Sequence, residues 1–138
     1  MNKALLVIDF INDIAHPDGR IAASAAHVLE QDAIVHANQA LAHARAYGWL
    51  VVLTKPRVSP FYGTALEPAL RANHIDHLYL CGVSTSWAIQ AAAREGHDRD
   101  YAITILEDAC AAADANEHHA SLRLLGRIAE ICKVAQLA

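Results

Sequence analysis

The chain has 138 residues, of which 54% are hydrophobic and 19% are charged, and its formal net charge is -4. This length predicts one domain over residues 1–138 with a sizeable core, and the apolar content argues against disorder. A weakly acidic chain has no electrostatic reason to bind nucleic acid or an anionic membrane, so we expect neither as a partner.

Cysteine and histidine usage argues against a disulfide framework or a metal centre. The three cysteines are an odd number in apolar or small-residue surroundings, which favours buried free thiols in a reducing compartment. The nine histidines show no zinc-ligand spacing, so we expect no metal, and no pattern predicts another cofactor. No segment has the features of a signal peptide or the length to span a bilayer, and we expect a cytoplasmic protein.

The first half of the chain alternates a buried strand, a helix and a second strand. Residues 4–8 (ALLVI) are all apolar, which predicts a strand buried on both faces that stops at Asp9. After a polar loop, apolar residues recur every three or four positions over about 26–47, which predicts a helix ended by Gly48. The run WLVVLT (49–54) predicts the second buried strand.

The second half continues the alternation. We expect a short helix over about 64–73 with Thr64 as its N-cap, followed by a strand over 77–82 (HLYLCG). The next helix is predicted over about 84–95, with Gly96 as its stop.

The last elements complete an α/β pattern. Residues 101–107 (YAITILE) predict a fourth strand, 108–114 (DACAAAD) a loop, 115–129 a helix and 130–137 (EICKVAQL) a short fifth strand. Strands that alternate with helices, without tight hairpin signals, predict a three-layer, Rossmann-like α/β fold: a parallel sheet with helices on both faces.

Ligands of such sheets bind beyond the carboxyl ends of the strands, which selects a small set of residues. Asp9 ends the first strand and Lys55 the second, and they form either a functional pair or a structural one, unless Asp9 simply caps the following loop. Residues 82–88 form a glycine-led strand-to-helix corner whose backbone N–H groups are typical of an anion or oxyanion site. A helix capped by Ser84 or Thr85 accounts for the same corner without a ligand.

Three aromatic residues are candidate substrate contacts. Trp87 follows the corner and is interpreted either as a substrate wall or as core. Phe61 and Tyr62 follow the Lys55 loop and either line the pocket or cover the sheet edge. Other polar residues are given structural or solvated roles: Glu107 and Asp108 as acceptors for loop amides, and His16, His97, His118 and His119 as solvated side chains.

Taken in order, LLVIDFIND, TKPRVSPFYGT, LCGVSTSWAIQAAAREGHDRDY and ILEDACAA resemble the isochorismatase-like hydrolases, also called the cysteine hydrolase superfamily. The match covers nearly the whole chain. It rests on the aspartate after the first strand, the lysine before Phe-Tyr-Gly-Thr, and the Gly-Val-Ser-Thr corner. The resemblance implies a hydrolase of small molecules that assembles as a homo-oligomer, a dimer or a tetramer.

The resemblance also implies residue roles. Asp9 matches the general acid or base of the family's triad, and Lys55 matches its cationic partner. The corner matches the oxyanion-hole segment, in which the family has a non-proline cis peptide that would here join Val83 and Ser84. The family's nucleophilic cysteine would fall at position 88, which is Ala88 in this chain.

Further departures from the family pattern accompany Ala88. Cys81, inside the third strand, and Cys110, in the predicted loop, are poorly placed to replace the missing thiol. The strand WLVV runs directly into the lysine-bearing segment where relatives have a long excursion, which removes or merges a strand. Ile11 stands where many relatives carry glutamine, and the metal-binding Asp-x-His motif of nicotinamidases is absent.

Three functional hypotheses remain open. The first is a hydrolase that cleaves an amide or related C–N bond with water as nucleophile, or a vinyl ether with Asp9 as general acid, as in isochorismatases proper. The second is a non-catalytic binding or assembly member of the fold. The third is a cysteine amidohydrolase trapped by replacement of its cysteine with Ala88.

Overall fold

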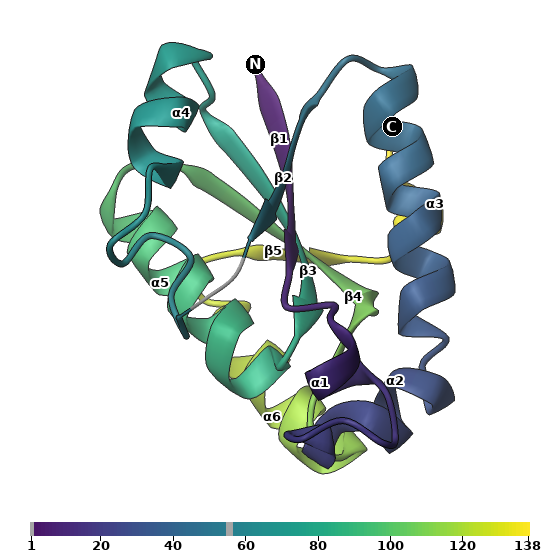
Figure 1. Ribbon diagram of the computed structural model, residues 1–138. Helices are drawn as coiled ribbons and strands as arrows, with labels where there is room; N and C mark the ends of the chain where they lie inside the picture. Colours follow the sequence, from purple (N-terminus) through teal and green to yellow (C-terminus); the bar gives the residue numbers. More distant parts are fainter. Residues whose placement is uncertain (1, 55–56) are drawn as a thin grey trace.

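The computed structural model describes residues 2–54 and 57–138 and shows one parallel sheet between two helical layers (Figure 1). The strands lie in the order β2-β1-β3-β4-β5, with β1 at Lys3–Ile8, β2 at Leu50–Thr54, β3 at His77–Val83, β4 at Ala102–Ala111 and β5 at Glu130–Cys132. Each neighbouring pair runs parallel; in β1, Leu6 is opposite Val52 on one side and Leu80 on the other. The predicted three-layer α/β fold is confirmed.

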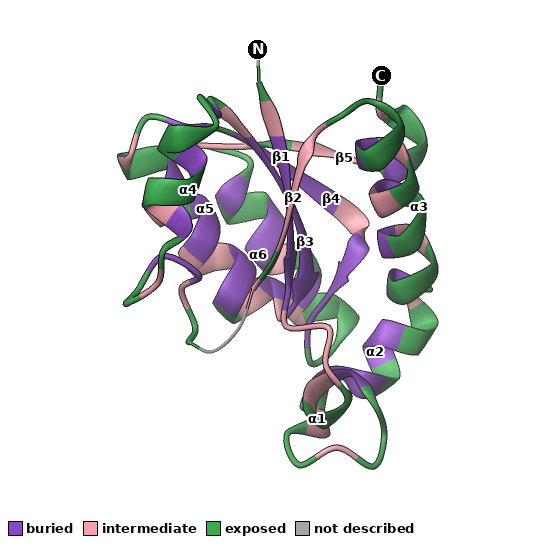
Figure 2. Ribbon diagram, turned by 45° about the horizontal axis from the view of Figure 1, so that its top comes forward, coloured by how far each residue is buried: buried purple, intermediate pink, exposed green. Residues whose placement is uncertain are grey.

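Helices cover both faces of the sheet and its carboxyl edge. One face carries α3 (Ala33–Ala46), and the other carries α4 (Leu66–Ala72), α5 (Gln90–Asp98) and α6 (Ala115–Leu125). The short α1 (Asn12–Ala15) and α2 (Ala25–Glu30) lie at the carboxyl ends of the strands. The inward sides of the helices and most of the central strands are buried (Figure 2).

The all-apolar sequence of β1 follows from burial on both faces. Alternate side chains of a strand point to opposite faces. Ala4, Leu6 and Ile8 pack into the core under α4, α5 and α6, whereas Leu5 and Val7 pack into the core under α3. A strand of this kind has no solvated side, so it lacks the polar alternation of an edge strand.

The single helix predicted over 26–47 is two helices, α2 and α3. Asp32 separates them with a φ of 49°. This left-handed conformation interrupts a helix, and aspartate adopts it more readily than most residues do. The predicted end of α3 is confirmed, since Gly48 follows it with a φ of 67°.

The fourth strand is longer than predicted, because β4 includes most of the segment expected to be a loop. A register shift between Leu80 and Gly82 lets Gly82 pair with Cys110 and Val83 with Ala111. With this pairing β4 runs to Ala111, and Cys110 therefore lies in a strand and not in a loop.

Helix boundaries also differ from the predictions. Gly96 does not end α5 but lies within it. A Cβ at this position would come 2.9 Å from Ile103 Cδ1, so the glycine allows α5 to pack closely on the sheet. The last long helix, α6, ends at Leu125 and so is shorter than expected. The N-cap of α4 is Ala65 and not the predicted Thr64, although Thr64 Oγ1 still accepts from the Leu66 N–H (3.2 Å) at the helix start.

The strand β2 forms one edge of the sheet in the described part of the chain. It pairs directly with β1, none of its residues is buried, and Leu53 is 73% exposed, so the prediction of a buried strand at this place is wrong. Among the described residues, no helix is long and apolar enough to cross a membrane.

Candidate active site

A cavity of about 360 Å³ lies at the carboxyl ends of β1 and β3, at the edge where the sequence predicts a site. Its walls combine apolar side chains with a few polar groups: Asp9, Ile14, Ile21, Ala23, Ser24, Arg57, Val58, Val83, Ser84, Trp87, Ala88, Ala113 and Glu117. The fold therefore brings five candidate residues to one cavity, namely Asp9, Val83, Ser84, Trp87 and Ala88.

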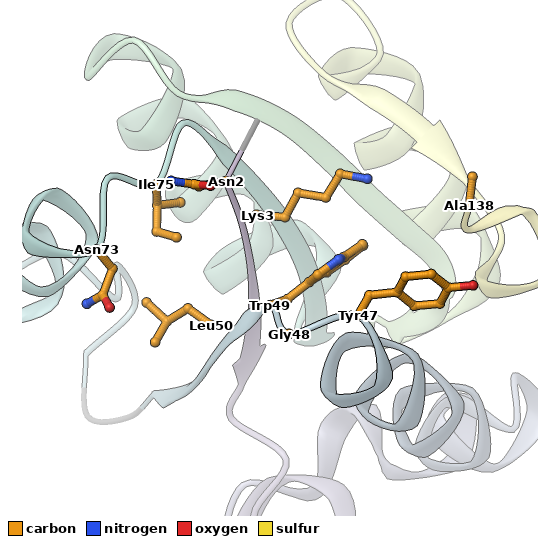
Figure 3. A pocket seen from close by; sticks show the side chains of 9 residues that line it. All are labelled: Asn2, Lys3, Tyr47, Gly48, Trp49, Leu50, Asn73, Ile75 and Ala138. Carbon is orange, nitrogen blue, oxygen red and sulfur yellow. The ribbon is translucent and has the colours of Figure 1, made fainter.

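A larger cavity, of about 570 Å³, lies at the opposite end of the sheet (Figure 3). There the Lys3 ammonium lies over two aromatic rings, 4.9 Å from the centroid of Trp49 and 5.5 Å from that of Tyr79, so its cation already has partners. Parallel sheets bind ligands at the carboxyl ends of their strands. Of these two cavities, only the smaller one is lined by Asp9 and by residues of the corner. The smaller cavity is therefore the candidate active site.

Asp9 occupies the turn by which the chain leaves β1. Its backbone N–H still donates to the Thr54 carbonyl of β2 (3.2 Å), while its φ of 56° turns the chain away from the sheet. Its half-buried side chain lines the cavity. Backbone pairing with β2 thus fixes the point at which Asp9 leaves the sheet, next to the cavity.

The corner after β3 has an unusual backbone. Gly82 has a φ of 139°, and a Cβ there would overlap the Ile8 carbonyl oxygen. The Val83–Ser84 peptide bond is cis, at the position that the family resemblance implies. Ser84 is the N-cap, as predicted, because its Oγ accepts from the Ser86 N–H (3.3 Å). The first turn after it, Thr85–Ile89, is a π-helix that continues directly into α5.

Ala88 and Trp87 form neighbouring parts of the cavity wall. The Ala88 side chain is buried, with 3% of the residue exposed, and its methyl group also belongs to the core under α5. Trp87 is 66% exposed, so it is a wall at the cavity rim and not a core residue. A methyl group has neither a nucleophilic atom nor a proton to exchange, so any chemistry here must come from other groups.

Three further candidate residues are Lys55, Phe61 and Tyr62. Lys55 lies outside the described residues, so its pairing with Asp9 stays a prediction. Phe61 is buried in the core and stacks on Tyr101, with ring centroids 6.4 Å apart, while Tyr62 is 70% exposed. Neither belongs to the described lining of the cavity, so the alternative of covering the sheet fits Phe61 better than substrate binding does.

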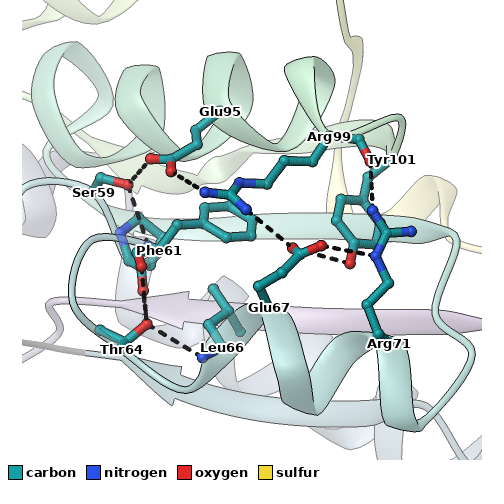
Figure 4. Close-up of polar contacts among 10 residues, drawn as sticks. Ser59, Phe61, Thr64, Leu66, Glu67, Arg71, Glu95, Arg99 and Tyr101 are labelled. Carbon is teal, nitrogen blue, oxygen red and sulfur yellow. Dashed lines mark hydrogen bonds and ion pairs between the residues drawn. The ribbon is translucent and has the colours of Figure 1, made fainter.

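The loop after β2 supplies two lining residues, Arg57 and Val58, that the sequence did not single out. A polar network holds this loop on α5 (Figure 4): Ser59 Oγ donates to Glu95 Oε2 (2.5 Å), and Arg99 donates to Glu95 Oε1 (2.7 Å). Burial raises the pKa of Glu95, but these two hydrogen bonds outweigh it and hold the pKa below its ordinary value. Ser59 thereby fixes the chain next to the two lining residues.

His118 is buried, with 1% exposed, and the prediction that it is solvated is wrong. Its Nδ1 lies 2.7 Å from Thr85 Oγ1, directly behind the corner. Burial, together with His27 and His119 nearby, lowers the pKa of His118 to about 4. Its place on α6, four residues before Leu122 and seven before Leu125, puts it on the buried face and could have predicted this burial.

The native cysteines do not supply the missing nucleophile. Cys81 and Cys110 are fully buried in β3 and β4. Burial raises the pKa of Cys110 to about 12 and raises that of Cys81 well above its ordinary value, and it raises that of the half-buried Cys132 to about 11. Thiols with such values are almost entirely protonated near neutral pH and are poor nucleophiles.

Metal chemistry has no ready set of ligands in the described ranges, where no three His, Cys, Asp or Glu residues lie close enough together to hold an ion.

The predicted acceptor role of Asp108 is confirmed, since its Oδ1 accepts from the Val134 N–H (3.0 Å).

Comparison with known proteins identifies the family. The model of the Isochorismatase domain matches residues 51–136. YecD of Escherichia coli O157:H7, an uncharacterized isochorismatase family protein, is 36% identical over 88 residues, which is 63% of this chain and 47% of that protein. The ureidoacrylate amidohydrolase RutB of Cronobacter sakazakii is 41% identical over 59 residues, 43% of this chain and 25% of that protein. The chain therefore spans less than half the length of these relatives.

Solved structures share the fold at lower identity. An isochorismatase-like hydrolase from Alkaliphilus metalliredigens has a TM-score of 0.81 at 19% identity, covering 99% of this chain and 96% of that one. N-carbamoylsarcosine amidase from Thermoplasma acidophilum has a TM-score of 0.81 at 24% identity, covering 99% of both chains. Since the family model covers more than half of the sequence and the fold agrees, the chain belongs to the isochorismatase family.

Proposed function

We propose that this chain is a hydrolase of a small molecule, cleaving an amide or related C–N bond in the cavity at the carboxyl ends of β1 and β3. One observation carries the proposal: Asp9, the cis-peptide corner and position 88 line the same cavity of about 360 Å³. Relatives named as amidohydrolases and amidases support this bond type.

With Ala88 in the wall, water is the nucleophile. Asp9 accepts a proton from water, whose oxygen attacks the carbonyl carbon of the substrate. The negative charge that develops on the carbonyl oxygen faces the corner, where the N-terminus of the helix that begins at Thr85 carries partial positive charge. The C–N bond then breaks, and the nitrogen leaves after receiving the proton, which gives a carboxylic acid and an amine or ammonia. Lys55 is the proposed cationic partner of Asp9.

The cavity also limits the substrate. Trp87, Val58 and Ile21 are apolar walls, and Arg57 is the cation among the described lining residues. These groups favour a small ligand with a flat or apolar body.

A second candidate function is ligand binding without turnover. The observation in its favour is Ala88, a methyl group in the buried wall where the family carries its thiol. In this case the corner still holds the polar end of a ligand, but no bond is broken.

The test of both candidates combines turnover with a reporter thiol. Wild type, Asp9→Asn and Ala88→Cys are assayed for ammonia or amine release from ureidoacrylate, N-carbamoylsarcosine and nicotinamide, and for pyruvate release from isochorismate. Turnover by wild type that Asp9→Asn abolishes supports the hydrolase. Turnover only in Ala88→Cys identifies a cysteine amidohydrolase that lacks its nucleophile, and pyruvate release identifies vinyl-ether chemistry.

The reporter thiol tests the site itself. The pH dependence of iodoacetamide labelling is measured for Ala88→Cys and for a matched control, Arg94→Cys, which lies exposed on the same helix. We expect the control to titrate near the ordinary value of about 8.5 and the thiol at position 88 to titrate lower. A lowered value without turnover by any variant supports ligand binding, whereas an unshifted value contradicts the proposed active site.

A further inference from the structure

A buried polar network lies directly behind the corner. Thr85 is fully buried and does not belong to the described lining of the cavity. Its hydroxyl lies 2.7 Å from His118 Nδ1 of α6, and Gln31 Nε2, from the turn after α2, lies 3.0 Å from His118 Nε2. Three segments far apart in the sequence therefore meet at one imidazole ring.

The hydrogen-bond partners determine which ring nitrogen carries the proton. Gln31 Nε2 donates to the Glu107 carbonyl of β4 (3.5 Å), and a carbonyl can only accept, so the amide nitrogen faces both Glu107 and His118. His118 Nε2 must then accept from Gln31. A neutral ring with an accepting Nε2 carries its hydrogen on Nδ1, which donates to Thr85 Oγ1.

The surroundings keep the ring neutral. Burial and two neighbouring histidines, His27 of α2 and His119 of α6, lower the pKa of His118 to about 4, so it is uncharged near neutral pH. The charged and titratable groups around the adjoining cavity, of about 420 Å³, are His36, Glu107, Asp108, His119 and Lys133. The neutral state is the one that the donor from Gln31 requires, because a protonated Nε2 would face another donor.

We propose that His118 is a positioning residue, which holds the corner in place by tying Thr85 through Gln31 to Glu107 in β4. Thr85 follows Ser84, the second residue of the cis peptide, and opens the turn that carries Trp87 and Ala88. A fixed Thr85 therefore fixes the wall that would face the reacting group. The consequence of this positioning for catalysis rests on the proposed function.

The first test uses the unaltered chain. Long-range proton–nitrogen NMR spectra distinguish the two neutral tautomers of a histidine, and we expect His118 to be protonated at Nδ1 at pH 7. A ring protonated at Nε2, or one that titrates like a solvated histidine, would overturn the proposal.

The second test uses near-isosteric variants and needs no substrate. His118→Asn keeps a donor near the place of Nδ1, whereas His118→Leu, of similar size, removes it; Thr85→Val removes the partner hydroxyl. The readout is the indole N–H cross-peak of Trp87, with that of Trp49, packed under α3 and far from the corner, as the internal control. We expect the Trp87 peak to move in His118→Leu and Thr85→Val and to return in His118→Asn, while the Trp49 peak stays.

The outcomes separate this proposal from the proposed function. Folded His118→Leu and Thr85→Val proteins with an unmoved Trp87 peak would show that the network only fills space. If His118→Leu does not fold, Thr85→Val, which only replaces a hydroxyl with a methyl group, still decides. A moved Trp87 peak in a chain without hydrolytic activity would support the positioning role and count against the hydrolase.

Discussion

Replacing Gly82 with alanine should be the most damaging single change at the base of the corner. Gly82 pairs with Ile8 across β1 and β3, and its φ of 139° is one that L-residues rarely adopt. An added Cβ would overlap the Ile8 carbonyl oxygen and lie 2.8 Å from its carbonyl carbon and 2.9 Å from its Cα. All three atoms are backbone, so they can move only if the β1–β3 ladder moves with them.

Two effects, backbone strain and overpacking, determine the expected loss in the free energy of unfolding. A strained backbone conformation costs about 1–3 kcal/mol, and overpacking against an unyielding neighbour costs a further ~1–3 kcal/mol. We expect Gly82→Ala to lower the free energy of unfolding by about 3–5 kcal/mol, a large part of the roughly 5–15 kcal/mol typical of a domain. Gly48→Ala is the matched control, because its φ is also positive, at 67°, but no atom lies within 4 Å of the added Cβ. Its expected loss is about 1 kcal/mol.

Urea unfolding followed by far-ultraviolet circular dichroism measures both variants. With a slope of roughly 1–3 kcal/mol per molar urea, the difference between the two variants corresponds to about 1 M or more in the midpoint. A Gly82→Ala protein within about 1 kcal/mol of Gly48→Ala would refute the close approach of β1 and β3 at this residue. Failure of Gly82→Ala alone to fold would be the same effect in its extreme form.

Three further predictions concern capping, pH and the loop network. Asp114→Ala removes the acceptor for the Glu117 N–H (2.8 Å) at the start of α6, and urea unfolding should show a loss of about 1 kcal/mol; no change would contradict the cap. The pKa of His118 is lowered to about 4 from 6.5, so the unfolded chain binds more protons between these values, and stability should fall as pH drops from 6.5 to 4. At 1.36 kcal/mol per unit this is about 3 kcal/mol at most, and His118→Asn should flatten that part of the pH–stability curve. Ser59→Ala removes the hydrogen bond to Glu95, so the pKa of Glu95 should rise in an NMR titration, and an unchanged value would show that the Arg99 contact suffices.

Sequence patterns predicted the fold well because the central strands β1, β3 and β4 are mostly buried, whereas the edge strand β2 is not. Short all-apolar runs such as that of β1 are typical of strands in the middle of a parallel sheet, and their alternation with helices defines such a sheet. The errors lie where local geometry overrides composition. The break at Asp32 depends on one left-handed residue, and the extension of β4 depends on a register shift at Gly82, neither of which has a periodic signal.

The candidate site was predictable only where it lies on the sheet. Asp9 and the corner follow from the strand-end rule, which is a property of the fold. Arg57 and Ile21 reach the cavity from loops, and a loop path cannot be derived from the pattern of one sequence. His118 was missed because a histidine was judged by its polarity and not by its position on the buried face of α6.

The exposed edge of β2 has a consequence for how copies of this chain can meet. Thr54 turns its carbonyl toward β1, so by alternation the backbone groups of Val51 and Leu53 point outward, and no lysine, proline or bulge within Leu50–Thr54 blocks them. At the other end of the described sheet, β5 has three residues. Two molecules joined antiparallel along β2 would form one continuous sheet around a two-fold axis and leave no long edge for a third. Strand addition at this edge would therefore be self-limiting, and it would end in a closed pair instead of a growing fibre.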